Sequence, residues 1–564
     1  MLLTEGEPAM QLIKDRKISF CLLIVLIVMI SALSACSSDE AKKAEEDQNS
    51  GASSYSADFI TAVEEEPDTN NFQATTYYYT VATNVFDRLV ETKTGNDGTN
   101  GISPSLAESW EISDDRRTYT FHLRDDVKFS NGEELTSDDV LYTFSRLLTD
   151  PESCNQDIAR VIKGADQLES GRAKSFKGFR VISDRDFSIT LKKPFEAFLS
   201  SLSTPAASIM NRESAEEAGD RFGTDPNAMV GTGPYIFAEW EHGERMVLRA
   251  NKECWSGAPE NEGVQILFLS DPEYIRTLYD DGGLDIMDLD DLDNYAEYYI
   301  HGDIYQDGLQ RVQRVGVTYI ALNGSVEPLD DVRVRKALQL SIDRRVLLGA
   351  VYGGRGELEN GIFPHGLYGF NETLAEIPYD IDKATELLTE AGYPNGFDMT
   401  ISVKSTSSRW EDTMMRLTAS MWKRIGVNAK IEILSEADFM KRRKKGRLTC
   451  YTATWTADYN DPDNFIYTFF GAKNNTRFRS LCYSDNNVMH RVRSARMISD
   501  PEKRIREYQD LEKKIIQDDA AWIPLFSRVH LYMLSDRITE FAPIWNGSVR
   551  SSYRTASVKK DNWT

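Results

Sequence analysis

The N-terminal segment constrains this chain more than any other part of it. A basic stretch, residues 14–17, precedes an almost entirely apolar run over residues 18–33, and small residues then lead into Cys36. This layout is typical of a secretory signal. Small side chains suit the groove of a signal peptidase, and the thiol of a cysteine can carry a thioether-linked lipid. We therefore expect residues 1–36 to be a lipoprotein signal, with lipidation at Cys36.

A plain transmembrane anchor is the alternative, because the apolar run is close to the shortest length that spans a bilayer. The lipobox-like residues before Cys36 and the polar residues after it favour lipidation. Stable anchoring takes two acyl chains, which a diacylglyceryl cysteine provides. Met10 lies just before the basic stretch, so a translation start at Met10 instead of Met1 stays open.

Residues 37–54 are rich in Ser, Asp, Glu, Lys, Ala and Gly and have no apolar periodicity, so we expect a disordered tether. No later stretch approaches about 18 consecutive apolar residues, the length of a membrane span. We expect the remainder to be soluble and to reach the membrane through its lipid anchor only. With 564 residues in all, the chain has the length of about three or four domains.

The charge balance limits the possible partners. The formal net charge is −24, whereas phosphate binding requires a basic surface, so nucleic acid is not an expected partner. Attraction to an anionic membrane by charge alone is also disfavoured. One basic cluster, residues 441–445, departs from this trend, and we interpret it as a solvated turn or helix end.

The cysteines do not indicate a metal site. Four of them lie beyond Cys36 and permit three pairings: Cys154, Cys254, Cys450 and Cys482. We take the pairing of Cys450 with Cys482 as the first to test, and unpaired thiols as the alternative. No CxxC motif and no Cys/His cluster with ligand spacing occurs, so we expect no metal and no cofactor.

Acidic runs at residues 64–66 and 288–293 raise the question of paired catalytic carboxylates. Both runs lie in stretches that we interpret as solvated faces, and no nucleophile–base constellation accompanies them. We therefore do not expect an enzyme.

Beyond residue 55 the pattern mixes short strands with helices. Residues 118–123 alternate apolar and polar side chains and predict a strand, and residues 179–191 predict a hairpin. The four residues 136–139 resemble a capping box at the start of a helix. Apolar residues at helical spacing predict helices over residues 331–342, 380–391 and 501–518. Mixed α/β lobes without internal repeats are expected.

Five sequence blocks occur in a fixed order between residues 60 and 545. They are residues 107–142, 231–255, 322–344, 387–393 and 455–462, the last of which begins Trp455-Thr456-Ala457-Asp458. In this order they resemble the oligopeptide/dipeptide-binding family of ABC importer receptors, solute-binding family 5. A single block would be weak evidence, but the five together extend over nearly the whole mature chain.

Some residues of these blocks have a structural interpretation. Gly231, Gly233 and Pro234 predict a tight turn into a strand at residues 235–237. They do not form a phosphate loop, because no GK[ST] sequence follows. Arg333 and Arg335 are expected to make ion pairs on the surface of a helix that starts near residue 331.

The resemblance implies an α/β fold: a two-lobed periplasmic-binding-protein clamshell, type II-like, with an additional third domain. Lobe I would combine residues 55–88, 205–315 and 525–564. Domain II would be residues 89–204, and lobe III residues 316–524. Two chain crossings between the lobes would make a hinge, and closure would trap a solute between them.

The resemblance also indicates a solute site. In peptide-binding relatives, an acid at the position of Asp458 holds the α-ammonium of the peptide. A cleft that excludes water makes a lone ammonium costly, so a fixed carboxylate is needed to offset that cost. The other candidate ligand-binding residues are Trp455, Thr456, Ala457, Thr76, Tyr77, Ser405, Thr406 and Arg443.

Several of these residues have a competing structural role. Asp458 would cap a turn before Pro462, Trp455 would pack in a core, and Arg443 would be solvated in its basic cluster. Asp461, directly before Pro462, is interpreted as part of the turn.

Three departures from the family pattern leave the length of the cargo open. Dipeptide-type relatives place an arginine for the carboxylate of the ligand near the position of Ser405, and none stands there. Thr452 replaces an arginine that precedes the tryptophan in oligopeptide-type relatives. Gly316 and Thr456 stand near the places of a cysteine pair. A fixed-length dipeptide clamp is therefore disfavoured.

We expect a monomeric, lipid-anchored receptor on the extracellular side of the cell membrane, or in the periplasm if the envelope has an outer membrane. It would bind oligopeptides and deliver them to the permease subunits of an ABC importer. The alternatives are a receptor of the same fold for a nickel chelate, an opine or an oligosaccharide, and a receptor that senses peptides without importing them.

Overall fold

The structure, a computed structural model, describes residues 58–94, 100–289, 300, 308–406, 409–549 and 552–559. The predicted signal, Cys36 and the predicted tether lie outside these ranges, as does most of the acidic run 288–293. Within the described ranges, no helix combines the length and the apolar character that crossing a membrane requires.

Residues 59–559 form one compact unit with several hydrophobic cores. One core joins distant segments of the chain, from Phe59 to Val558, and a second lies wholly within residues 89–209. Two further cores lie within residues 315–526. The boundaries of lobe I, domain II and lobe III stay a prediction, and these names are kept for the predicted segments.

In the part of the chain that the structure describes, lobe I contains a four-stranded sheet and short helices. The strand order is β1 (Asp58–Val63), β10 (Gly263–Phe268), β9 (Arg245–Ala250) and β8 (Tyr235–Glu241). The helices are α2 (Thr80–Val85), α7 (Arg212–Ala218) and α8 (Pro272–Asp280). A small ribbon closes the C-terminal part, β19 (Ile538–Glu540) with β20 (Ser557–Val558).

Domain II is an antiparallel sheet covered by helices. Its strands are β4 (Ala107–Ile112), β5 (Thr118–Leu123), β7 (Asp186–Thr190) and β6 (Phe179–Val181), which confirms the predicted strand and hairpin. Its helices are α3 (Ser137–Thr149), α4 (Asp157–Arg160), α5 (Ala165–Glu169) and α6 (Phe198–Leu202). Thr136 and Asp139 form the predicted capping box of α3. A hairpin of β2 (Val90–Thr94) and β3 (Asn100–Pro104) is separate from the sheet.

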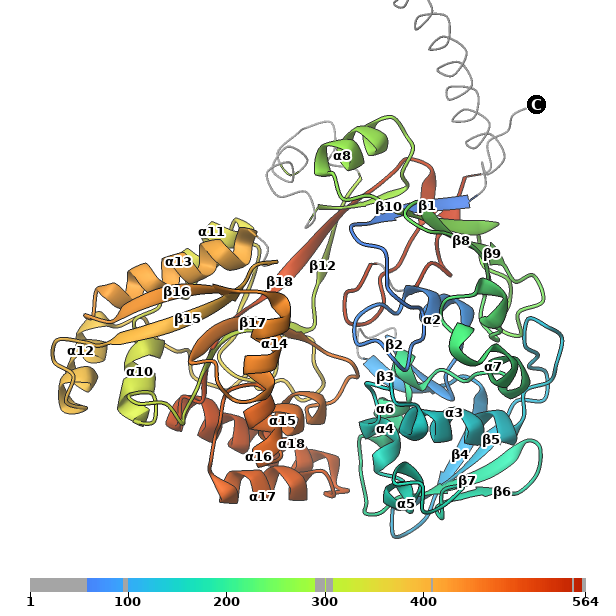
Figure 1. Ribbon diagram of the computed structural model, residues 1–564, viewed down its shortest axis with the longest axis horizontal. Coiled ribbons are helices and arrows are strands. Elements are labelled where there is room, and N and C mark those ends of the chain that lie inside the picture. The colour runs from blue at the N-terminus through green and yellow to red at the C-terminus, as the bar shows by residue number, and fades with distance from the viewer. Residues whose placement is uncertain are drawn as a thin grey trace, which may run out of the picture. The chain divides into compact units, whose positions relative to one another are not determined.

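One long strand, β18 (Trp522–Leu534), connects lobe I with lobe III (Figure 1). Its C-terminal half pairs with β11 (Ile286–Asp288) and β12 (Leu309–Gln313). Its N-terminal half pairs with β13 (Gly316–Leu322), which in turn pairs with β17 (Cys450–Thr456). A short strand, β14 (Gly356–Leu358), pairs with the middle of β18. The segment between β12 and β13 and the strand β18 are thus two places where the chain passes between the lobes.

Helices cover both faces of the β18-β13-β17 sheet. One core holds the parallel pair β15 (Asp398–Lys404) and β16 (Asn428–Leu434) with α10 (Val332–Leu340), α11 (Arg344–Tyr352), α12 (Ile381–Glu390) and α13 (Arg409–Lys423). The other holds α14 (Glu436–Lys444), α15 (Asp463–Phe470), α17 (Asn486–Ala495) and α18 (Pro501–Lys513), and α16 (Lys473–Phe478) packs against α14 and α15 outside this core. The three helices predicted in this region are confirmed, except that the last turns into a π-helix over Lys514–Asp518.

The prediction for Arg335 is wrong. Arg333 pairs with Asp331 on the surface as expected. Arg335 is buried, and its guanidinium donates to the carbonyl oxygens of Leu329 and Asp519. It anchors α10 to the end of the π-helix instead of pairing with a surface acid.

The turn before β8 needs glycine because of a close approach between segments. A Cβ atom added at Gly231 would lie 2.0 Å from the carbonyl oxygen of Val85, and one at Gly233 would lie 2.7 Å from that of Asn84. Real Cβ atoms do not approach so closely, so the turn packs directly against the end of α2.

The four cysteines of the described body are free thiols. Cys450 is buried in β17, and Cys482 lies on a separate loop, so the pairing that we placed first does not form. Unpaired thiols, the alternative, are what the structure contains.

A buried acid in lobe III, Glu512, is expected to make the free energy of unfolding depend on pH. Burial raises the pKa of Glu512 from an ordinary 4.5 to about 8, although its carboxylate accepts the backbone N–H groups of Phe363 and Ile362. Between these values the folded protein keeps a proton that the unfolded chain has released. The free energy of unfolding should therefore fall as pH rises, by at most about 1.4 kcal/mol per pH unit from this group.

Glu512→Gln is expected to remove this slope, because the amide oxygen still accepts both N–H groups and does not ionise. Urea unfolding at pH 5, 6.5 and 8 would measure it, with the exposed Glu502→Gln as the matched control. Parallel pH dependences for wild type and Glu512→Gln would contradict the assignment.

Candidate functional site

Asp458 lies just beyond the end of β17 and is held by an asparagine of the next helix. The Asp458 backbone N–H donates to Asn464 Oδ1 at 3.0 Å, and Asn464 Nδ2 donates to Asp458 Oδ2 at 2.9 Å. Trp455 Nε1 also donates to Asn464 Oδ1, at 3.3 Å. Asn464 lies in the first turn of α15, so the start of this helix fixes the carboxylate and the indole together.

The carboxylate of Asp458 opens onto a space enclosed by protein. The residue is exposed, and yet burial raises its pKa, against the opposing effects of the Asn464 hydrogen bond and the positive charge of Arg479. An exposed acid on an outer surface would not be desolvated in this way. Among the described residues, no cationic side chain forms an ion pair with it. The acid therefore lines an internal cleft without a counter-ion.

Residues of lobe I and domain II approach this region. Burial and the negative charge of Asp458 raise the pKa of Tyr79, which precedes α2. Asn460 Nδ2 donates to the carbonyl oxygen of Asn100 at 3.1 Å, and the Glu196 N–H donates to the carbonyl oxygen of Arg496 at 3.0 Å. Contacts from three parts of the fold thus surround the cleft.

A cavity of about 260 Å³ lies beside these contacts. Residues of the β2–β3 hairpin line it on one side, and residues that follow β17, together with α18, line it on the other; they include Asn100, Ile102, Asn460, Asp461 and Arg504. The space between the β2–β3 hairpin and the turn that follows Asp458 is therefore hollow.

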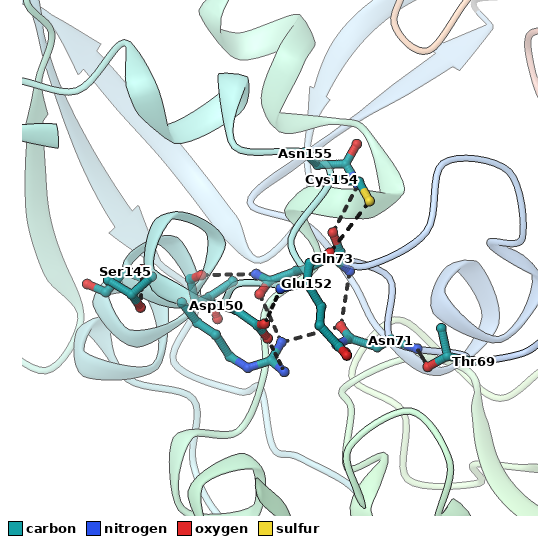
Figure 2. A network of polar contacts seen from close by, with 11 residues as sticks. Thr69, Asn71, Gln73, Ser145, Asp150, Glu152, Cys154 and Asn155 are labelled. Atoms are coloured by element: carbon teal, nitrogen blue, oxygen red, sulfur yellow. Dashed lines mark hydrogen bonds and ion pairs between the residues drawn. The ribbon is translucent and has the colours of Figure 1, made fainter. Parts of the chain in front are cut away.

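The loop that leads to Tyr79 is fixed by a polar network (Figure 2). Asn155 Nδ2 donates to the carbonyl oxygens of Gln73 and Thr75, at 3.3 and 2.8 Å, and the Cys154 N–H donates to Gln73 O. The Tyr79 hydroxyl donates to Thr75 O at 2.9 Å. Domain II thus holds the lobe I loop in place, and the carbonyl oxygen of Thr75 already accepts a hydrogen bond from Asn155.

Tyr77 and Thr406 both lie near Glu436. Tyr77 is 73% exposed, and burial, followed by the charges of Asp68, Glu65 and Glu436, raises its pKa. Thr406 Oγ1 donates to Glu436 Oε2 at 3.4 Å. Thr76 is exposed beside Tyr77, and Ser405 is exposed while its N–H extends the β15–β16 pairing to Leu434 O. No contact joins these residues to Asp458.

The three residues before Asp458 differ in what they can offer. Trp455 is half-buried and meets Phe469 edge to face at 5.3 Å, so it contributes to the core and to the cleft. Thr456 of β17 lies opposite Gly316 of β13. These are the two positions near which oligopeptide-type relatives carry a cysteine pair. Ala457 is buried, and its N–H and C=O are both taken, by Val315 and Asn546.

Arg443 is not solvated with the rest of its basic cluster. Arg443 is half-buried and lies near Tyr319 and Tyr451. Burial of these two tyrosines raises their pKa, and the positive charges of Arg443 and Arg479 act in the opposite direction. The other basic residues of 441–445 are exposed at the end of α14, as predicted.

Asp461 does more than shape a turn. Its Oδ1 accepts the Asp463 N–H at 2.9 Å, as a turn residue would. It also forms a buried ion pair with Arg504 of α18. The turn after Asp458 is therefore tied to a distant helix.

Three residues of the site escaped sequence reasoning: Tyr79, Asn464 and Arg479. Each lies on a different element, and none belongs to a motif of its own. Asn464 follows the Trp455 block directly, and this proximity to Asp458 in sequence was the one available signal.

Asn464→Ala is expected to weaken binding at this site, because Asp458 would lose its orienting donor and its own N–H would lose its acceptor. The expected loss is about 1–3 kcal/mol. Titration calorimetry with a peptide measures it. Asn475→Ala, which removes only a bond to Tyr467 O, is the matched control. Equal losses in both variants would contradict the positioning role.

The chain is similar to known binding proteins over most of its length. Residues 101–477 match the model of bacterial extracellular solute-binding proteins, family 5. Heme-binding protein A of Haemophilus influenzae is 31% identical, over 82% of this chain and 85% of that protein. The dipeptide-binding protein of Escherichia coli is 27% identical, over 80% and 84%. The structure of a dipeptide-binding protein from Pseudoalteromonas sp. SM9913 in complex with Met-Leu superposes with a TM-score of 0.75, at 23% identity, and covers 89% of this chain and 100% of that one.

Proposed function

Because the chain belongs to the bacterial extracellular solute-binding proteins of family 5, we propose that it binds peptides for an ABC importer in the cleft that contains Asp458. It is a solute-binding protein and not an enzyme, and it works outside the cytoplasm. The observation that carries the peptide proposal is a desolvated carboxylate with no ion-pair partner in the described structure. Such a group favours a solute that brings its own cation, and the α-ammonium of a peptide is one.

The edge of the lobe III sheet supports the same solute. Among the described strands β17 hydrogen-bonds to β13 alone, although β15 lies close to it, so the other edge of β17 has no strand paired with it. An extended peptide can add to such an edge by main-chain hydrogen bonds, which suit a receptor that accepts many side chains. Asp458 at the end of β17 would then fix the register of the peptide from its N-terminus.

Heme is the second candidate, because the relative named heme-binding protein A is 31% identical. A nickel chelate has less support, since the described residues contain no group of three or more His, Cys, Asp or Glu side chains arranged to hold a metal. Opines, oligosaccharides and a purely sensory role stay alternatives without a supporting contact.

The anchoring of the protein is part of the proposal. Processing before Cys36 would leave a lipidated cysteine, a tether over residues 37–54 and a monomeric receptor body that docks on the permease subunits. The basic, apolar and small-residue order of residues 14–36 supports it. Mass spectrometry of the processed N-terminus, with Cys36→Ala as the control, tests the anchor independently of the solute.

The solute is tested by purifying the protein without denaturation and identifying what it releases. A population of short peptides is the expected result, and Asp458→Asn should release far less of it. A single non-peptide compound, heme included, would refute the peptide proposal.

A further inference from the structure

Two arginines of lobe III lie near each other without an anionic partner, and one of them, Arg479, is also near Asp458. Arg443 comes from α14 and Arg479 follows α16, and both are half-buried. Neither guanidinium forms an ion pair or a hydrogen bond with any described residue, and Arg443 Nε is a buried atom without an acceptor. The other buried arginines of lobe III, such as Arg335 and Arg504, have carbonyl or carboxylate acceptors.

Aromatic rings hold Arg479 in place. Its guanidinium carbon lies 4.7 Å from the ring centre of Phe469 and 5.3 Å from that of Trp455. Its carbonyl oxygen accepts the hydroxyl of Tyr451 at 2.7 Å. Contacts of this kind use the flat face of a guanidinium and leave the N–H groups at its edge free to donate.

The charges around Arg479 do not balance. Burial lowers its pKa and the charge of Arg443 lowers it further, while the charge of Asp458 has the opposite effect. Two cations thus lie near each other, and the one carboxylate near Arg479 does not pair with it. In a protein of net charge −24, such a local excess of positive charge is stabilised when an anion enters the cleft.

We propose that Arg479, assisted by Arg443, binds a carboxylate of the solute whose ammonium is bound by Asp458. The inference rests on the proposed function for the ammonium. It makes Arg479 a specificity-determining residue and places the receptor for the carboxylate on a different element from Ser405. The favoured solutes are compact ones that carry both charges, such as short peptides. The carboxylates of heme offer the same chemistry from a different source.

The test compares trialanine, trialanine amide and N-acetyl-trialanine by titration calorimetry. The wild type should bind trialanine at least about tenfold more tightly than its amide, a preference expected of a charge-assisted contact. Arg479→Gln should abolish that preference and keep the preference for a free N-terminus. Arg477→Gln is the matched control, because Arg477 also lies over a ring, that of Phe478, on the exposed side of α16. An unchanged preference for the free acid in Arg479→Gln would overturn the inference.

Two further arms separate this inference from the peptide proposal. Hemin and hemin dimethyl ester are titrated alongside the peptides. If only hemin binds, and esterification weakens it at least about tenfold in the wild type but not in Arg479→Gln, the peptide proposal fails and the carboxylate receptor stands. Equal binding of hemin and its ester, without peptide binding, overturns both. If Arg479→Gln unfolds, Arg443→Gln must show the reduced preference in its place.

Discussion

Replacing Asp458 by asparagine is expected to weaken the binding of a peptide with a free N-terminus by about 2–5 kcal/mol. The substitution keeps the shape of the side chain and removes the one charge that faces the α-ammonium. The ammonium would then be desolvated in the cleft without an anion, and this penalty makes up much of the loss. Titration calorimetry measures the effect, and the exposed Asp510→Asn on α18 of the same lobe is the control.

Two further measurements separate this role from a general loss of structure. N-acetylated peptides should bind the wild type and Asp458→Asn equally weakly, because these peptides have no α-ammonium and neither protein can form the ammonium–carboxylate contact with them. The affinity of the wild type should also fall on acidification at a pH above the ordinary range of aspartate, since burial raises the pKa of Asp458. Asp458→Asn should lack this fall. Equal affinities of the wild type for free and acetylated peptides would refute the assigned role.

Local sequence signals predicted individual elements well. The alternating pattern of residues 118–123 predicted a strand, which is β5, and the capping box at Thr136 predicted the start of a helix, which is α3. Signals of this kind depend on neighbours within a few residues. The place of β18 in a six-stranded sheet depends on its pairings with β11, β12, β13 and β14, which lie far away in sequence. No local pattern contains that information.

The same limit applies to charged residues. Asp461 before a proline and Arg335 on a helix both have a plausible local interpretation, and their actual partners, Arg504 and the carbonyl of Asp519, are distant. Asp458 was identified because its block resembles a family, whereas Arg479 stands in no such block. A guanidinium without an acceptor is visible only when its surroundings are known in three dimensions.

The buried ion pair next to the site leads to the second large effect. Asp461→Asn is expected to lower the free energy of unfolding by about 3–5 kcal/mol, because it leaves the charge of Arg504 buried without its partner. The side chains of Arg504 and Asp461 are only 6% and 5% exposed. Asp463 cannot replace the lost acid, since it already pairs with Arg496 at 3.0 Å. Urea unfolding at pH 7 measures the loss.

The double variant Asp461→Asn with Arg504→Met tests the cause. A methionine beside Tyr508 removes the charge and keeps part of the packing, so the double variant should be more stable than Asp461→Asn alone. If Arg504→Met lowers the stability of Asp461→Asn further, the broken Asp461–Arg504 ion pair is not the origin of the lost stability. Folded Asp461→Asn should still prefer free over N-acetylated peptides, because the carboxylate that it lacks pairs with Arg504 of α18 in the wild type and does not face the ammonium. Stability and recognition would then be separated within three residues of one turn: Asp461 fastens the turn to the lobe, and Asp458 presents its charge to the solute.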